Sequence, residues 1–176
     1  MKILRIIFIM ILVLMSDELA AQTDWQVETK SCNGNEYIVE HTEFIYAITN
    51  KKYDFAKSAT RDIEFDGERI EDFENRRYPL REQIYNVANG IFNFAKIPVP
   101  DDDVYVFAMQ CFFDSQSKDY VGAYFVFDVE IKDYITLEKL NLLESKLHQA
   151  KINTGRTNLL DNEKYFTIAV EVSVGE

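Results

Sequence analysis

The stretch that decides the fold is VYVFAMQCFF (Val104–Phe113), followed after a polar loop by YVGAYFVF (Tyr120–Phe127). Both runs are rich in β-branched and aromatic residues, and the loop between them, Asp114–Asp119, is polar, so they predict the two strands of a hairpin. Apolar side chains occupy both faces of each run, whereas a strand with one wet face alternates apolar and polar residues. We therefore expect a sheet that is covered on both faces.

Two helices are predicted around this hairpin. Pro79 is expected to open the first, which should end before Pro98. Thr136 is a good N-cap for the second, which should run to about Gln149. Their buried stripes are expected to be Leu80, Ile84, Val87, Ala88 and Ile91 in the first helix, and Leu137, Leu140, Leu143 (or its neighbour Leu142) and Leu147 in the second.

A regular alternation of apolar and polar residues predicts a final strand over Tyr165–Val174. The order from Pro79 onward is then helix, strand, strand, helix, strand. This order predicts an α+β fold, in which an antiparallel sheet carries two helices on one face.

Residues 23–77 are expected to be strand-rich and to pack on the same domain as residues 78–176. The runs Trp25–Lys30 and Glu36–Ile48 flank Asn33-Gly34-Asn35, a strong hairpin signal.

A second hairpin is predicted around Asp66-Gly67, between Arg61–Phe65 and Glu68–Phe73. Since two helices on one side leave the other face of the sheet open, we expect these N-terminal hairpins, or a partner, to cover that face.

Residues 1–22 have the pattern of an export signal. Lys2 and Arg5 are basic, Ile6–Met15 is an unbroken apolar run, and Leu19–Gln22 supplies small residues at a cleavage point. A membrane-spanning helix needs about 20 apolar residues, which is more than this run provides. We expect a signal peptide that is removed, and a mature chain in the periplasm or outside the cell that does not span the membrane.

The composition argues against one class of partner. The net charge is −11, whereas a nucleic-acid surface needs clustered Lys and Arg. We expect no nucleic acid among the partners.

The chain has two cysteines, Cys32 and Cys111. In an exported protein one disulfide between them is one interpretation. The other is two unpaired thiols, with Cys111 buried as a small hydrophobic residue.

Few residues suggest chemistry. Asp101, Asp102 and Asp103, together with Asp114 and Asp119 if the hairpin brings them near, form an acidic cluster of the kind that binds calcium. The spacing of an EF-hand is missing, so a solvated acidic loop is preferred. The two histidines, His41 and His148, have no second histidine at ligand spacing. We predict no metal site, no cofactor and no catalytic residues.

Tyrosines provide the other candidate site. Tyr105, Tyr120 and Tyr124, with Phe125, would offer flat apolar faces with polar edges to a sugar or a peptide. The preferred alternative is that these rings form a core between two layers.

Several segments carry a resemblance to known families: Tyr78-Pro79, Phe112-Phe113-Asp114, the helix Ile135–Glu144 and the strand Phe166–Val174. On these the chain resembles a family of small exported bacterial proteins of unknown function, and its C-terminal half is more distantly similar to the TonB C-terminal domain. The resemblance implies a fold and an exported location, and supplies no activity.

From the sequence we therefore expect an exported, non-enzymatic protein that binds a protein or a component of the cell envelope. A small-molecule or glycan-binding protein with an aromatic sheet face is the second hypothesis, and a hydrolase acting through acidic residues is the third. The oligomeric state is left open.

Overall fold

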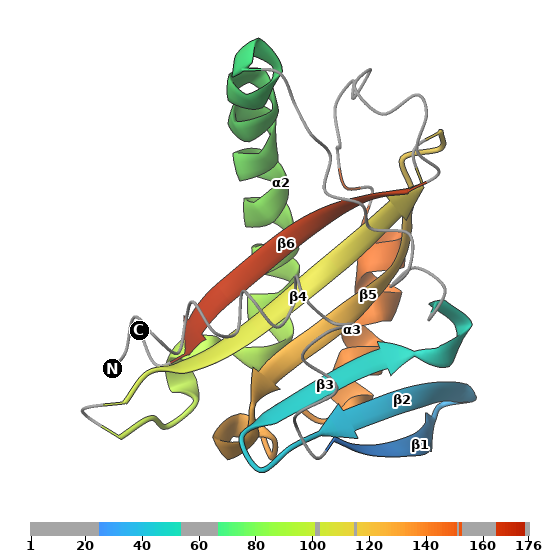
Figure 1. Cartoon of the computed structure of the whole chain (residues 1–176), viewed down its shortest axis with the longest axis vertical. Coiled ribbons are helices and arrows are strands. Elements are labelled where there is room, and N and C mark those ends of the chain that lie inside the picture. Colours follow the sequence, from blue (N-terminus) through green and yellow to red (C-terminus); the bar gives the residue numbers. More distant parts are fainter. Residues whose placement is uncertain are drawn as a thin grey trace.

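A computed structural model describes residues 25–53, 67–100, 103–114, 116–150, 152 and 165–174, with backbone alone at 67–78 and 166. In these residues six strands form one antiparallel sheet in the order β1-β2-β3-β5-β4-β6. Helices α2 and α3 both lie on one face of it, behind the sheet in Figure 1. The predicted α+β class, with two helices on one face, is confirmed.

The predicted central hairpin is present as β4 (Tyr105–Asp114) and β5 (Tyr120–Asp128). β4 also pairs along its whole length with β6 (Tyr165–Val174), the predicted final strand. Side chains of alternate β4 residues point toward the helices and are buried: Phe107, Met109, Cys111 and Phe113. The order helix, strand, strand, helix, strand is therefore confirmed.

α3 (Leu137–Gln149) begins where its cap predicts, since the Thr136 side chain accepts a hydrogen bond from the Lys139 N–H. It buries Leu140, Leu143 and Leu147 against the sheet. Leu142, the alternative member of the stripe, is 45% exposed, which places Leu143 on the buried face.

α2 (Gly67–Phe92) is longer than predicted and contains Pro79 in its interior. Proline is tolerated most easily at a helix start, but inside a helix it removes one hydrogen bond without always ending the helix. The predicted start at Pro79 is therefore wrong, and so is the strand over Glu68–Phe73. The other arm of that predicted hairpin, Arg61–Phe65, lies outside the described residues.

The first N-terminal hairpin is confirmed as β1 (Gln26–Cys32) and β2 (Asn35–His41). Its two-residue turn, Asn33-Gly34, has positive φ angles of 49° and 81°, as a type I′ turn requires. β3 (Ile45–Asn50) then pairs with both β2 and β5.

The first N-terminal hairpin extends the sheet and does not cover its open face, so that alternative is wrong, and cover by a partner stays a prediction. β3 pairs with the outer edge of β5, whose backbone N–H and C=O groups need partners, and β2 and β1 continue the same sheet.

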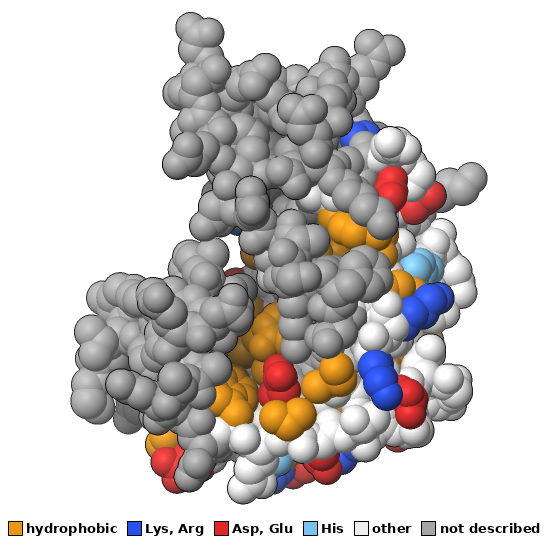
Figure 2. Space-filling view, turned by 45° about the vertical axis from the view of Figure 1, so that its right-hand side comes forward, with side chains coloured by type: hydrophobic (Ala, Val, Ile, Leu, Met, Phe, Trp, Pro, Cys, Tyr) orange, Lys and Arg blue, Asp and Glu red, His pale blue; other side chains and the backbone are white. Residues whose placement is uncertain are grey.

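The face opposite the helices is nevertheless buried at its centre. Ala47, Val106, Phe112 and Val126 are at most 5% exposed, and Trp25 packs against the cluster that contains Ala47, Val106 and Val126. In Figure 2, which is turned by 45° from Figure 1, hydrophobic side chains of the described residues lie close together near the middle of the view. The central strands are buried on both faces, as their sequence predicts.

None of the described helices, α2 included, combines the length and the apolar character needed to cross a membrane.

Candidate functional site

A groove of about 380 Å³ lies on the helix side of the sheet, beside the start of α3. Its residues come from β1, β2, β3, β5 and the segment that leads into α3. They are Lys30, Val39, Tyr46, Ile48, Phe127, Lys132, Asp133, Ile135, Thr136 and Leu137. The groove therefore has a mainly apolar lining with a few polar groups, which is typical of small-molecule sites.

A row of stacked rings crosses three strands at this groove. The rings of His41 and Tyr46 lie 4.9 Å apart and within 12° of parallel, and those of Tyr46 and Phe127 lie 5.7 Å apart and within 7°. The sheet register produces this row, because His41 is the partner of Tyr46, and Tyr46 is the partner of Phe127. Tyr46 and Phe127 thus offer the groove an ordered aromatic wall.

Charged side chains lie at the rim. Lys30 comes from β1, and Lys132 and Asp133 come from the turn before α3. This turn is fixed by backbone bonds from Lys132 to Val129 and from Tyr134 to Ile131. It is also held by the Lys139 ammonium, which donates to the Tyr134 carbonyl at 3.0 Å.

α3 is fastened to the sheet by a buried polar network. Glu144 Oε2 accepts hydrogen bonds from Tyr37 Oη at 2.8 Å and from Asn50 Nδ2 at 3.3 Å. One turn earlier in the helix, Asn141 Oδ1 lies 3.1 Å from Tyr37 Oη and accepts from Asn35 Nδ2 at 2.8 Å. These contacts set the position of the helix whose first turn lines the groove.

Glu144 is a buried carboxyl without a basic partner among the described residues. It is 4% exposed, it takes part in none of the ion pairs of the described residues, and its Oε1 has no hydrogen-bond partner there. Burial raises the pKa of Glu144, and the hydrogen bonds from Tyr37 and Asn50 oppose that rise. Burial therefore penalises the charged form of this carboxyl, since an unpaired buried charge is costly.

Glu144 was not predicted as a site residue, although the sequence contained a signal for it. Residue 144 follows Leu140 by four positions and precedes Leu147 by three, so it belongs to the buried stripe of the helix. A charged residue in such a stripe needs polar partners across the interface.

The three predicted tyrosines do not share one surface. Tyr105 packs on the helix side, against the main core. Tyr120 is also on that side, 6% exposed, with a hydroxyl that has no partner among the described residues. Tyr124 packs on the opposite face, beside Ala47 and Val126. The aromatic surface that borders a groove is instead formed by Tyr46 and Phe127.

The two histidines lie at different places. His41 belongs to the stacked row. His148, at the end of α3, has its ring 4.8 Å from that of Tyr120, and its Nε2 is 3.4 Å from Tyr53 Oη. Partial burial, and then the charge of Lys52, lower the pKa of His148, while Asp119 raises it.

The acidic cluster lies mostly outside the description, because Asp101 and Asp102 are not among the described residues. Asp103 is exposed and precedes β4, whereas Asp114 ends it. About ten strand residues, or roughly 30 Å, separate the two, so they cannot share an ion. Among the described residues no group of three His, Cys, Asp or Glu side chains could hold a metal ion.

Cys32 and Cys111 are both buried and both free. Cys32 is in β1 and Cys111 in β4, and four strand-to-strand steps of about 4.8 Å separate those strands in the sheet order. A disulfide needs Cα atoms within about 7 Å, so the structure has two thiols at these positions. Burial raises the pKa of each thiol.

Comparison with models of protein families, with curated proteins and with solved structures finds no match to this chain.

Proposed function

We propose that the protein is an exported, non-catalytic binding protein, and that its groove holds a small molecule with a flat apolar body and an acidic group. The observation that carries this proposal is the combination of an aromatic wall and two rim lysines in one cavity of about 380 Å³. Ligand sites of proteins commonly have about 300–1,000 Å³.

The apolar body of the ligand is supported by the stacked row. Tyr46 is fixed between the rings of His41 and Phe127, so little side-chain entropy is lost when an apolar ligand packs against the edge of its ring. Ile48 and Leu137 add aliphatic contacts.

The acidic group is supported by the rim. Lys132 presents an ammonium group at the groove in a chain whose net charge is −11. Lys30 adds a second lysine to the lining and is ion-paired with Glu28 on its own strand. Asp133 at the same rim would repel a second acidic group, which favours a ligand with one charged end.

Binding, rather than catalysis, is supported by where the ionisable groups lie. Glu144 and both thiols are buried in the core and are not among the residues that line the groove. A thiol with a raised pKa is a poor nucleophile, because the thiolate is the reactive form.

Nuclear magnetic resonance tests the proposal with naphthalene-2-carboxylate as the probe and naphthalene-2-carboxamide as its uncharged match. We expect shifts at the amides of Ile48 and Leu137, stronger for the carboxylate. Tyr46→Ala should abolish them, and Lys132→Ala should remove the preference for the carboxylate. Phe44→Ala is the matched control, because Phe44 does not line the groove. Shifts that are unchanged in Tyr46→Ala would place binding elsewhere.

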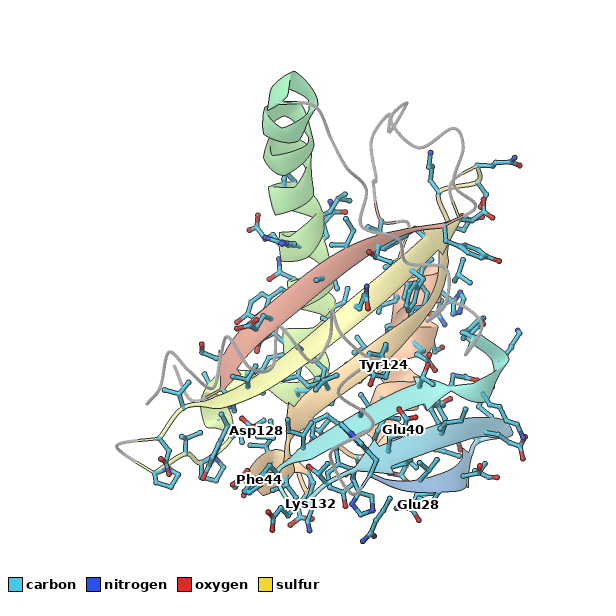
Figure 3. The ribbon with its side chains drawn as sticks, viewed as in Figure 1. Glu28, Glu40, Phe44, Tyr124, Asp128 and Lys132 are labelled. Carbon is cyan, nitrogen blue, oxygen red and sulfur yellow. The ribbon has the colours of Figure 1, made fainter. Side chains whose placement is uncertain are left out.

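A protein or envelope partner is the second candidate, and exposed rings next to the groove favour it. Phe44 is 58% and Tyr134 is 37% exposed. The Phe44 carbonyl accepts from the Val129 N–H, which brings the β2–β3 turn against the turn before α3, and Figure 3 shows Phe44 and Lys132 at this end of the sheet. Retention of the protein on isolated envelopes should then be lost in Phe44→Ser and kept in Tyr46→Ala.

Export rests on residues 1–22, which lie outside the described residues. Protein from the native host should have an intact mass that lacks them, and a mass that includes them would contradict cleavage.

A further inference from the structure

β1 is the outermost strand of the described sheet at its N-terminal edge. It pairs with β2 over all seven of its residues without a break in register. All of its residues except Cys32 are exposed, and Figure 3 places Glu28 on this outermost strand. Its sequence contains no proline and its pairing no bulge, the usual devices that block an edge.

The hairpin geometry determines which backbone groups of β1 face outward. In a two-residue hairpin the residues next to the turn, Cys32 and Asn35, form a hydrogen-bonded pair, and such pairs alternate along an antiparallel ladder. Gln26, Glu28, Lys30 and Cys32 therefore direct their backbone N–H and C=O groups to β2. Val27, Thr29 and Ser31 direct theirs to the open edge.

The side chains next to that edge carry opposite charges. Glu28 and Lys30 lie on the same face of β1 and form an ion pair of 2.5 Å, with each side chain nearly half exposed. They are equally spaced about Thr29. A two-fold axis through Thr29 would place Glu28 of each copy opposite Lys30 of the other copy, which gives two pairs of opposite charge.

This register also satisfies the backbone. With Thr29 opposite Thr29, and Val27 opposite Ser31, every outward-facing N–H and C=O of the three residues meets a partner. Glu28 and Lys30 then occupy the non-hydrogen-bonded positions, where facing Cα atoms approach to about 4.5 Å and side chains interact best. Of the two-fold registers centred on Val27, Thr29 or Ser31, only the one centred on Thr29 pairs these two charges.

We propose that β1 is the interface for a second copy of this chain, which pairs antiparallel about Thr29 and joins the two sheets into one. The axis is perpendicular to the sheet, so the helices of both copies lie on the same face. Lys30 also lines the groove, and the second copy therefore lies next to that groove.

The charges on β1 differ from those that protect an edge. An edge is guarded by charges that repel an identical strand, whereas Glu28 and Lys30 attract one. The contact is one strand wide and is smaller than the roughly 1,200–2,000 Å² of stable complexes. The dimer is therefore reversible and forms with rising concentration.

Sedimentation equilibrium over a wide range of concentration tests the interface, with the full chain and the chain from Thr23 run side by side. We expect a monomer–dimer equilibrium. Lys30→Glu places like charges opposite each other and should weaken the dimer about tenfold or more. The charge swap Glu28→Lys with Lys30→Glu should restore it. Exchanging Glu36 and Lys51, an exposed ion pair away from this edge, is the matched control and should have no effect.

Thr29→Pro gives an independent test, because it removes an outward N–H without changing a charge and proline is tolerated on an edge strand. Circular dichroism of this variant should show a folded chain, and sedimentation equilibrium should show a monomer. A wild-type chain that stays monomeric at every concentration overturns the proposal. So does a dimer that survives Lys30→Glu, or one that the charge swap does not restore.

Discussion

Tyr37 Oη donates a hydrogen bond to Glu144 Oε2 over 2.8 Å and so joins β2 to α3 across the core. Tyr37 is fully buried and Glu144 nearly so, and the two residues are 107 positions apart in the chain. Burial, and then the charge of Glu144, raise the pKa of Tyr37, so its hydroxyl stays protonated and remains the donor. This contact makes the attachment of α3 sensitive to the ionisation of one carboxyl.

The first prediction concerns that ionisation. Because the pKa of Glu144 is raised in the folded protein, the folded state binds its proton more tightly than the unfolded state does. The stabilisation is complete below the unfolded pKa and is lost as the pH rises through the folded pKa. Glu144→Gln should remove this dependence, and above the folded pKa it should stabilise the protein by about 1–2 kcal/mol, since an amide satisfies the same partners without a charge. Urea unfolding at a series of pH values measures both effects.

Glu138→Gln is the control on the same helix. Hydrogen bonds from its own backbone N–H and from the Thr136 hydroxyl lower the pKa of Glu138, so its contribution is lost as the pH falls. The two variants should change the pH profile in opposite directions. A Glu144→Gln variant that is less stable than wild type at pH 8 would show that the carboxylate is favourable there.

A second prediction concerns the close approach of Gly122 to Tyr53. A Cβ atom at residue 122 would lie 2.6 Å from two ring carbons of Tyr53 and 2.9 Å from its Cβ. Gly122→Ala should therefore lower the free energy of unfolding by about 1–3 kcal/mol through overpacking. Gly90→Ala is the matched substitution in α2, where a Cβ meets open space, and it should stabilise by up to about 1 kcal/mol. Equal effects of the two substitutions in thermal or urea unfolding would contradict the predicted clash.

Local patterns predicted most of the fold. The two-sided apolar runs located β4 and β5, and Asn33-Gly34 located the first turn, because each signal comes from a few adjacent residues. Pro79 misled, since proline is a common first residue of a helix but here lies inside α2. The residues after Asp66-Gly67 misled as well, since Glu68–Phe73 belongs to α2 and is not a strand.

The groove was not predicted, because it depends on pairing between strands. Tyr46 and Phe127 are distant in sequence and come together only through the register of β3 with β5. Periodicity shows which side of a strand a residue occupies, but not which strand lies next to it. The position of the N-terminal strands within the sheet, rather than over it, was missed for the same reason.

A third prediction separates the buried stripe of α3 from its exposed neighbour. Leu143 is fully buried and Leu142 is 45% exposed. Leu143→Ala should cost about 2–5 kcal/mol by leaving a cavity in the core, whereas Leu142→Ala should change the free energy of unfolding by less than about 0.5 kcal/mol. Urea unfolding of the two variants side by side makes the comparison, and a larger loss for Leu142→Ala would mean that the helix is rotated about its axis.

The last prediction concerns the thiols. Cys32 is 8% exposed and Cys111 is fully buried, and burial raises the pKa of both. Since the thiolate is the species that reacts, and burial also blocks access, neither should react with an aromatic disulfide reagent in the folded protein. In denaturant without reductant, two thiols per chain should react at once. A count of zero in denaturant would establish the disulfide that the strand order argues against. Fast reaction of one thiol in the folded protein would instead show that its strand opens to solvent, and Cys32, on the edge strand, is the one expected to react first.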